Sequence, residues 1–181
     1  MHGETSGQSA DRITMRAYRD ADWPAVCVVH DRARPDELRG SCDPRAFVPL
    51  ADEQDDATSF QRSRKVVACV GEHLVGFVGV DGTYLAWLYV DPAYYGRGIG
   101  RQLLRLGIRL IGPQAWTVVL AGNTRARRLY ESEGFQVVQT FESANAGYPC
   151  TCVQLALSLS ASHTPGSGGE SLGEADRGGA A

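Results

Sequence analysis

Strand-like runs of apolar residues dominate the first half of the chain. They cover residues 13–18, 65–71, 74–80 and 83–90, and the first of them alternates apolar and polar positions as a half-buried strand does. Glycine-containing links join the last three runs and are typical of hairpin turns. The pattern therefore predicts an antiparallel meander of three strands, preceded by one separate strand.

Between the first strand and the meander, the pattern favours helix and then irregular chain. Asp20 or Asp22 is placed to cap a helix that runs through residues 23–30. Pro35, Pro44 and Pro49 interrupt the chain beyond this helix. We expect short helical pieces and loops over the polar, turn-rich stretch 40–63.

After Asp91-Pro92 the apolar period changes from that of a strand to that of a helix. Ile99, Leu103, Leu104, Ile108 and Ile111 recur at helical spacing, and Gly112-Pro113 ends the helix. A strand at 116–120, a helix at 123–133 and strands at 135–141 and 150–157 come next. This order predicts an α+β fold: one mixed, mostly antiparallel sheet flanked by helices.

The two ends of the chain differ in composition from its middle. The 181 residues are 43% hydrophobic, which is enough for one well-buried domain. Residues 1–11 are predicted to be a flexible N-terminus, 12–158 the folded domain, and 159–181 a disordered tail rich in Gly and Ser.

We find no membrane-spanning run and no export signal. Five cysteines without CxxC spacing suit a reducing compartment, so we expect a cytoplasmic protein without a metal site.

The charges are separated along the chain, although the formal net charge is only −3. Residues 97–128 contain seven arginines and no acid, whereas residues 20–56 contain ten acids against four arginines. The small net charge argues against a strongly basic nucleic-acid binder. Any single one of these charged residues is also explained by a position on a solvent-exposed helix face, without a functional role.

The strongest chemical signal is a glycine-rich turn between the strand at 83–90 and the helix that begins near residue 99. Gly96, Gly98 and Gly100 remove side chains that would block a ligand, and N–H groups at a helix start bind anions. Arg97 and Arg101 add positive charge beside them. The spacing fits neither a Walker A loop nor a Rossmann fingerprint.

This stretch resembles motif A of the GCN5-related N-acetyltransferases (GNAT), written [QR]-x-x-G-x-[GA]. Gly98 and Gly100 fill the two small positions, and Tyr95 replaces the usual Gln or Arg. Downstream, Asn123 to Phe135 is similar to the family's N-x-x-A-x-x-[LF]-Y-x-x-x-G-F segment, and residues 13–22 are similar to its opening. The resemblance covers residues 12–158 and implies the GNAT fold.

The resemblance also implies a ligand and a set of roles. In this family the turn holds the diphosphate of acetyl-CoA, and the strand before it holds the pantetheine arm and thioester. The matching positions here are Leu88, Tyr89, Val90, Tyr95, Gly96, Arg97, Gly98, Ile99, Gly100, Arg101 and Asn123. Tyr130 matches the tyrosine that protonates the leaving thiolate; the alternative is an aromatic core anchor on an amphipathic helix.

The proton acceptor for the attacking amine is left open by the sequence. Many relatives carry a Glu on the strand that matches 83–90, but that strand contains no acid here. Glu37, Asp36, His30 and Glu142 are candidates without supporting spacing, and His30, Glu37 and Trp87 are our candidates for acceptor binding. Cys150 and Cys152 are interpreted as buried small hydrophobes.

The resemblance thus implies acetyl transfer to a primary amine, either a small molecule or a peptide, by direct attack in a ternary complex. The alternative is a coenzyme A-binding module or sensor without catalysis. Neither nucleic acid nor membrane is an expected partner, and the exposed C-terminal strands are compatible with a homodimer.

Overall fold

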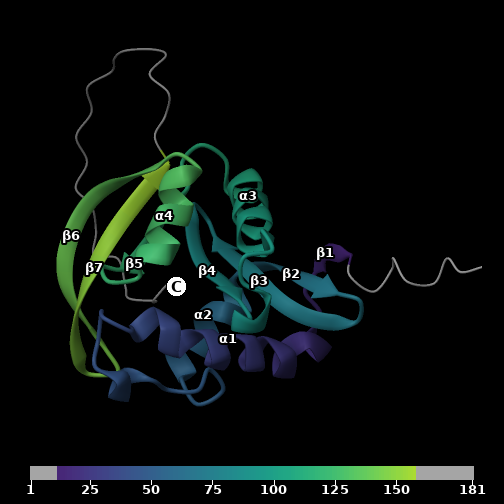
Figure 1. The fold of residues 1–181 in the computed structure, drawn as a ribbon, viewed down its shortest axis with the longest axis horizontal. Helices are drawn as coiled ribbons and strands as arrows, with labels where there is room; N and C mark the ends of the chain where they lie inside the picture. The colour runs from purple at the N-terminus through teal and green to yellow at the C-terminus, as the bar shows by residue number, and fades with distance from the viewer. Residues whose placement is uncertain (1–11, 158–181) are drawn as a thin grey trace, which may run out of the picture.

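Seven strands form one sheet in the computed structural model, which describes residues 12–157 (Figure 1). The predicted flexible N-terminus at 1–11 and the predicted tail at 159–181 lie outside the described residues. The strands are β1 (Ile13–Ala17), β2 (Arg64–Val70), β3 (His73–Asp81), β4 (Tyr84–Val90), β5 (Trp116–Leu120), β6 (Phe135–Asn145) and β7 (Tyr148–Leu157). Their order across the sheet is β1-β2-β3-β4-β5-β7-β6. The predicted mixed, mostly antiparallel sheet is therefore confirmed.

The meander forms because tight turns connect strands of matching length. Gly71 and Gly82 adopt positive φ angles of 58° and 56° in the two hairpin turns, where glycine avoids a steric penalty. Each of β1, β2 and β3 pairs antiparallel with the strand that follows it, and within residues 12–157 only the pair β4–β5 is parallel. That parallel step needs a crossover, which a helix between the two strands provides.

Helices cover both faces of the sheet, as Figure 1 shows. On one face lie α1 (Trp23–Leu38) and α2 (Gln54–Arg62); on the other lie α3 (Ile99–Ile111) and α4 (Thr124–Ser132). Short 3-10 turns occupy 20–22, 44–46 and 92–94. Alternate residues of β4 enter the two cores: Leu88 packs with α3, whereas Tyr89 packs with α1.

Helix α1 continues through Pro35 to Leu38, farther than the predicted segment 23–30. Proline removes only one helical hydrogen bond, and burial of the last turns compensates for that loss. Arg34, Glu37 and Leu38 are all buried at this end of the helix. The continuation matters because it carries a carboxylate to β4.

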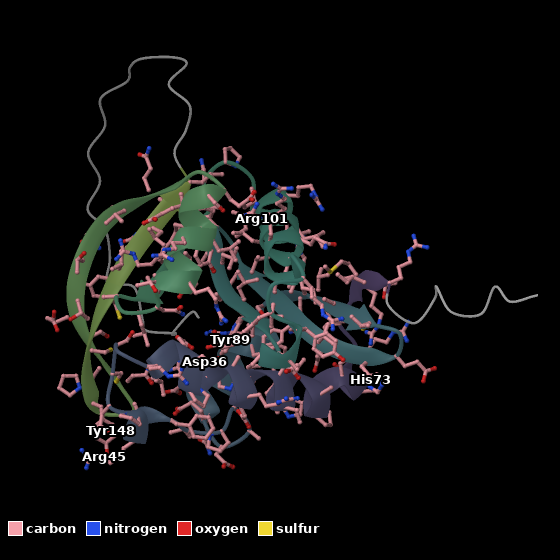
Figure 2. The ribbon with its side chains drawn as sticks, viewed as in Figure 1. Asp36, Arg45, His73, Tyr89, Arg101 and Tyr148 are labelled. Carbon is pink, nitrogen blue, oxygen red and sulfur yellow. The ribbon has the colours of Figure 1, made fainter. Side chains whose placement is uncertain are left out.

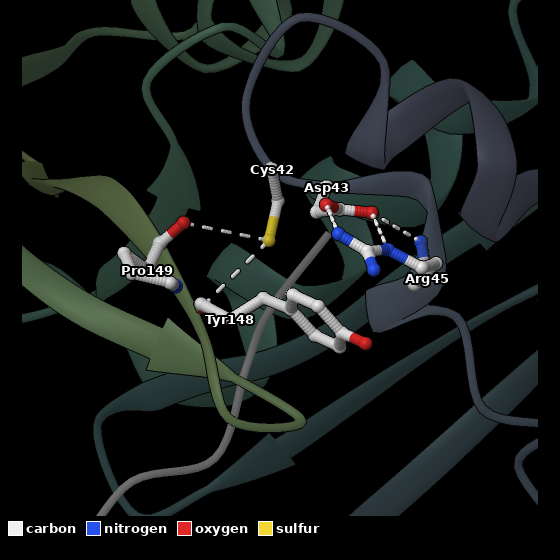
Figure 3. A network of polar contacts seen from close by, with 5 residues as sticks. All are labelled: Cys42, Asp43, Arg45, Tyr148 and Pro149. Atoms are coloured by element: carbon white, nitrogen blue, oxygen red, sulfur yellow. Dashed lines mark hydrogen bonds and ion pairs between the residues drawn. The ribbon is translucent and has the colours of Figure 1, made fainter.

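The loop after α1 is attached to the β6–β7 hairpin at the far end of the sheet (Figure 3). The Sγ atom of Cys42 lies 3.7 Å from the Pro149 carbonyl oxygen and 3.9 Å from that of Tyr148. Asp43 pairs with Arg45, whose guanidinium lies 5.2 Å from the centre of the Tyr148 ring. Side-chain contacts therefore join the acid-rich segment to the C-terminal strands.

None of the helices within residues 12–157 combines the length and the apolar character that crossing a bilayer requires.

Candidate active site

A cavity of about 460 Å³ opens where β4 ends and α3 begins. The turn after β4, the first turns of α3 and α4, and one face of α1 line it. It contains every predicted coenzyme residue except Arg97: Leu88, Tyr89, Val90, Tyr95, Gly96, Gly98, Ile99, Gly100, Arg101 and Asn123. The motifs that are separated in sequence therefore meet around one hollow.

The glycine-rich turn has the backbone conformation that its sequence requires. Gly96 and Gly98 have φ angles of 77° and 76°, in the left-handed region that disfavours residues with a Cβ. Gly98 precedes α3 and supplies no capping side chain. The first N–H groups of a helix lack intrahelical acceptors, and those of Ile99, Gly100 and Arg101 belong to residues that line the cavity. An uncapped helix start facing a hollow fits a phosphate oxyanion.

The two arginines of the turn differ in position. Arg101, which is labelled in Figure 2, lines the cavity. Its guanidinium also contacts Ser132 at 3.2 Å, at the end of α4, and Glu133 at 3.3 Å, directly after that helix. Arg97 lies outside the lining, with its guanidinium 5.0 Å from the centre of the Tyr94 ring. Arg101 is therefore the better placed of the two for a bound anion.

Strands β4 and β5 diverge toward the cavity. Their only paired residues in the described chain are Tyr84 and Trp116, at the start of both strands. The Thr117 hydroxyl still donates to the Leu85 carbonyl at 2.9 Å, and beyond this point β5 pairs with β7 alone. The β4 backbone groups of Leu88–Val90 that point away from β3 therefore border a gap that an extended ligand is able to fill.

A β-bulge reorients the middle of β4. The register changes from Gly79 opposite Trp87 to Val80 opposite Leu85, which leaves Ala86 as an extra residue. Bulges occur often beside active sites because they redirect side chains. Here the bulge turns Ala86 and Trp87 toward the same face, against α1 and α2.

Tyr130 is fully buried in the core between α4 and the sheet. Its ring meets Phe135 edge to face at 5.3 Å. Its hydroxyl makes no hydrogen bond within residues 12–157. Burial raises the pKa of Tyr130, and the neighbouring Thr117 side chain opposes part of that rise. Tyr130 does not itself line the cavity, whereas Leu129 does. A buried hydroxyl without a partner is rare and suggests a function.

Asn123 caps α4 and lines the cavity at the same time. Its Oδ1 accepts a hydrogen bond from the Ala126 N–H at 3.1 Å, as a helix N-cap does. The amide nitrogen is the atom left to reach a ligand. The predicted coenzyme role and a capping role are therefore compatible at this position.

Glu37 is the one acceptor-side candidate that lines the cavity. It is only 4% exposed and lies beneath β4. The Tyr89 hydroxyl donates to its Oε2 at 2.7 Å, and Arg34 Nη1 lies 2.5 Å from the same oxygen. A carboxylate from α1 thus occupies the neighbourhood in which β4 itself offers no acid.

The other two acceptor-side candidates are part of the core behind β4. His30 is 2% exposed, bonds Asp31 at 2.8 Å and packs on Tyr89. Burial lowers the pKa of His30. Trp87 is 1% exposed and packs on Phe60. Neither side chain lines the cavity.

The remaining candidates for the proton acceptor lie elsewhere. Asp36 pairs with Arg39 at 2.9 Å beside a second, smaller hollow, and Glu142 accepts from the Thr151 hydroxyl on the β6–β7 hairpin.

The prediction that Cys150 and Cys152 are buried is confirmed, and burial raises the pKa of Cys152 to about 12. Within the described chain, no group of three or more His, Cys, Asp or Glu side chains is arranged for a metal ion.

Sequence reasoning missed several residues of this region. Ala33, Tyr94, Arg125, Ala126 and Leu129 also line the cavity. Of these, Arg125 carries a sequence signal, because it stands in the arginine-rich segment two residues after Asn123. The half-buried Asp56 on α2 was missed as well. Burial raises its pKa to about 6, and Arg34 opposes only part of that rise.

We expect Asp56→Asn to stabilise the fold at pH 8. The folded-state pKa of Asp56, about 6, lies above the ordinary value of 3.8, so the folded protein must hold an unfavourable charge above pH 6. The gain should be about 1 kcal/mol, less than the full shift implies because the side chain is partly exposed. It should fade as the pH falls from 6 to 4. Denaturant unfolding at pH 8 and pH 4.5 measures it, and equal gains at both values would contradict the assignment.

Comparison with known proteins gives the same family as the motifs. A family model described as an acetyltransferase (GNAT) domain matches residues 61–137. The uncharacterised N-acetyltransferase YafP of Escherichia coli K12 is 29% identical over 131 residues, which are 71% of this chain and 85% of YafP.

Two solved structures share the fold. A GCN5-related N-acetyltransferase of Rhodopseudomonas palustris superposes with a TM-score of 0.72 at 18% identity, covering 83% of this chain and 98% of that one. The yncA protein of Salmonella typhimurium, solved with its cofactor acetyl-CoA, gives a TM-score of 0.58 at 20% identity, covering 85% and 99%. With both motifs, the diverging strands and these likenesses in agreement, the chain belongs to the GCN5-related N-acetyltransferase superfamily.

Proposed function

We propose that this N-acetyltransferase moves the acetyl group of acetyl-CoA to a primary amine by direct attack, with both substrates bound together. One observation carries the proposal. A single cavity joins the uncapped start of α3, the unpaired edge of β4 and the carboxylate of Glu37. These are the parts needed to hold a diphosphate, orient an extended arm and receive an ammonium group.

The coenzyme half of the cavity fits acetyl-CoA in its chemistry. Acetyl-CoA would supply the acetyl group as a thioester. The N–H groups at the start of α3, with Arg101, would hold the diphosphate. Free backbone groups of Leu88–Val90 would bond the pantetheine arm, and an N–H there would polarise the thioester carbonyl.

Tyr130 is the proton donor in this proposal. Its hydroxyl is near Thr117 of β5 and Tyr84 of β4, where the two strands are still joined and from where they diverge toward the cavity. Burial raises its pKa, so the phenol carries its proton at neutral pH, and in this proposal the leaving thiolate sulfur takes up that proton. The absence of a hydrogen-bond partner for the hydroxyl within residues 12–157 supports this role.

The acceptor half of the cavity suits a cationic amine. A substrate ammonium has an ordinary pKa near ~10.4 and must lose a proton before it attacks. Both contacts to Glu37 fall on Oε2, so Oε1 is the oxygen left for that proton. Asp56 adds a second carboxylate near Glu37, and both belong to the acid-rich segment 20–56.

The test is a screen of amines against the full chain, following release of free thiol from acetyl-CoA. The panel should contain polyamines, aminoglycosides, lysine peptides and peptides with free N-termini, beside neutral amines. We expect turnover with one or more cationic acceptors. Coenzyme A binding without turnover of any acceptor would favour the alternative of a binding module or sensor.

A further inference from the structure

Tyr95 occupies the first position of motif A, where the family pattern has Gln or Arg. A phenol ring is a much weaker partner for a diphosphate than a guanidinium or an amide. Tyr95 nevertheless lines the cavity beside Gly96 and Gly98. The side chain at position 95 therefore lies where the motif predicts, but it lacks the charge or amide group that binds a diphosphate.

A guanidinium from another element lies directly on this ring. The Cζ atom of Arg125 is 3.4 Å from the centre of the Tyr95 ring. Arg125 is the second residue of α4, and it lines the same cavity as Tyr95 and Gly98. Two segments thirty residues apart thus bring a positive charge to the first position of the motif.

Arg125 also differs from three nearby arginines in its ion pairs. Arg101 and Arg105 pair with Glu133, and Arg127 pairs with Glu131. Within residues 12–157, no carboxylate pairs with Arg125. A guanidinium stacked on an aromatic ring keeps its edge N–H donors free, and those donors match phosphate oxygens in geometry. Contact with the ring therefore orients Arg125 and leaves guanidinium N–H groups for a phosphate oxygen.

We propose that Arg125, held by its stack on Tyr95, makes the contact to the coenzyme diphosphate that the side chain at position 95 makes elsewhere in the family. Two residues thus take the role of the single Gln or Arg in the family motif: the Tyr95 ring positions the guanidinium, and Arg125 supplies the positive charge. This inference rests on the proposed function, because it concerns the same coenzyme site.

Binding of unacetylated coenzyme A to the full chain tests the pair without relying on catalysis. Isothermal titration of Arg125→Ala should give a Kd about tenfold weaker than wild type, as expected for one lost charge-assisted contact. Arg128→Ala is the matched control, because Arg128 is exposed on the same helix and does not line the cavity. Equal affinities of Arg125→Ala and wild type would overturn the inference. A wild-type protein that binds no coenzyme A would overturn the proposed function and the inference together.

Two further measurements test whether Arg125 takes the role of position 95 and which phosphate of coenzyme A it contacts. In the Arg125→Ala background, Tyr95→Arg should restore most of the lost affinity, because it returns the charge to the family's own position. Failure of the rescue in a protein with unchanged thermal stability would contradict the assignment. Dephospho-coenzyme A keeps the diphosphate and lacks the 3′-phosphate, so the tenfold penalty should persist with it. Loss of the penalty would place Arg125 on the 3′-phosphate and overturn the diphosphate assignment.

Discussion

Tyr130→Phe should lower kcat for acetyl transfer by about 100-fold or more, the usual contribution of a positioned proton donor. The ring and its contact with Phe135 remain, so only the hydroxyl is lost. Because that hydroxyl has no hydrogen-bond partner in the described chain, its removal should leave the free energy of unfolding unchanged or slightly raised. The KM for acetyl-CoA should change little, since the residue does not line the cavity.

The matched control is Tyr18→Phe. Tyr18 also carries a buried hydroxyl without a partner among the described residues, but it packs against Phe60 on the opposite face of the sheet. Its substitution should leave kcat at the wild-type value. If steady-state kinetics give both variants the same activity as wild type, Tyr130 is only a core anchor.

Local patterns in the sequence account for most of the fold. The period of apolar residues and the glycine turns predict the meander and the helix at 99–111 because both depend on neighbours in the chain. The extension of α1 through Pro35 could not be predicted in this way. It depends on burial of Glu37 and Leu38 against other elements, which outweighs the local cost of proline.

The grouping of the proposed coenzyme residues around one cavity was predictable for the same reason. Leu88 to Arg101 is one continuous stretch, so its residues remain neighbours in the fold. The side of the cavity that Glu37 lines is instead assembled by tertiary structure. Tyr89 and Glu37 are 52 residues apart, and the Ala86 bulge has no signature that a single sequence reveals. Likewise, the stack of Arg125 on Tyr95 arises from the packing of α4 against the turn.

Glu37→Gln should lower kcat/KM for the amine by about 100-fold at pH 7, if Glu37 takes the ammonium proton. The amide keeps an oxygen to accept from Tyr89 but does not take up a proton at this pH. The deficit should shrink as the pH rises from 7 to 9, because the fraction of free amine in solution grows about tenfold per unit below its pKa of about 10.4. A purely structural defect would not shrink in this way.

Two further variants separate proton transfer from folding. Removing the Glu37 charge leaves Arg34 buried without its partner, which destabilises the fold. The double variant Glu37→Gln, Arg34→Met removes that problem and should show the same deficit with the same pH dependence. Glu142→Gln, which changes an exposed carboxylate on the β6–β7 hairpin, should retain wild-type kcat/KM. Two outcomes would contradict the assignment: a deficit in Glu37→Gln that is constant from pH 7 to 9, or one that disappears in the double variant. Glu37 would then have only a structural role at the end of α1, and the amine would lose its proton to water.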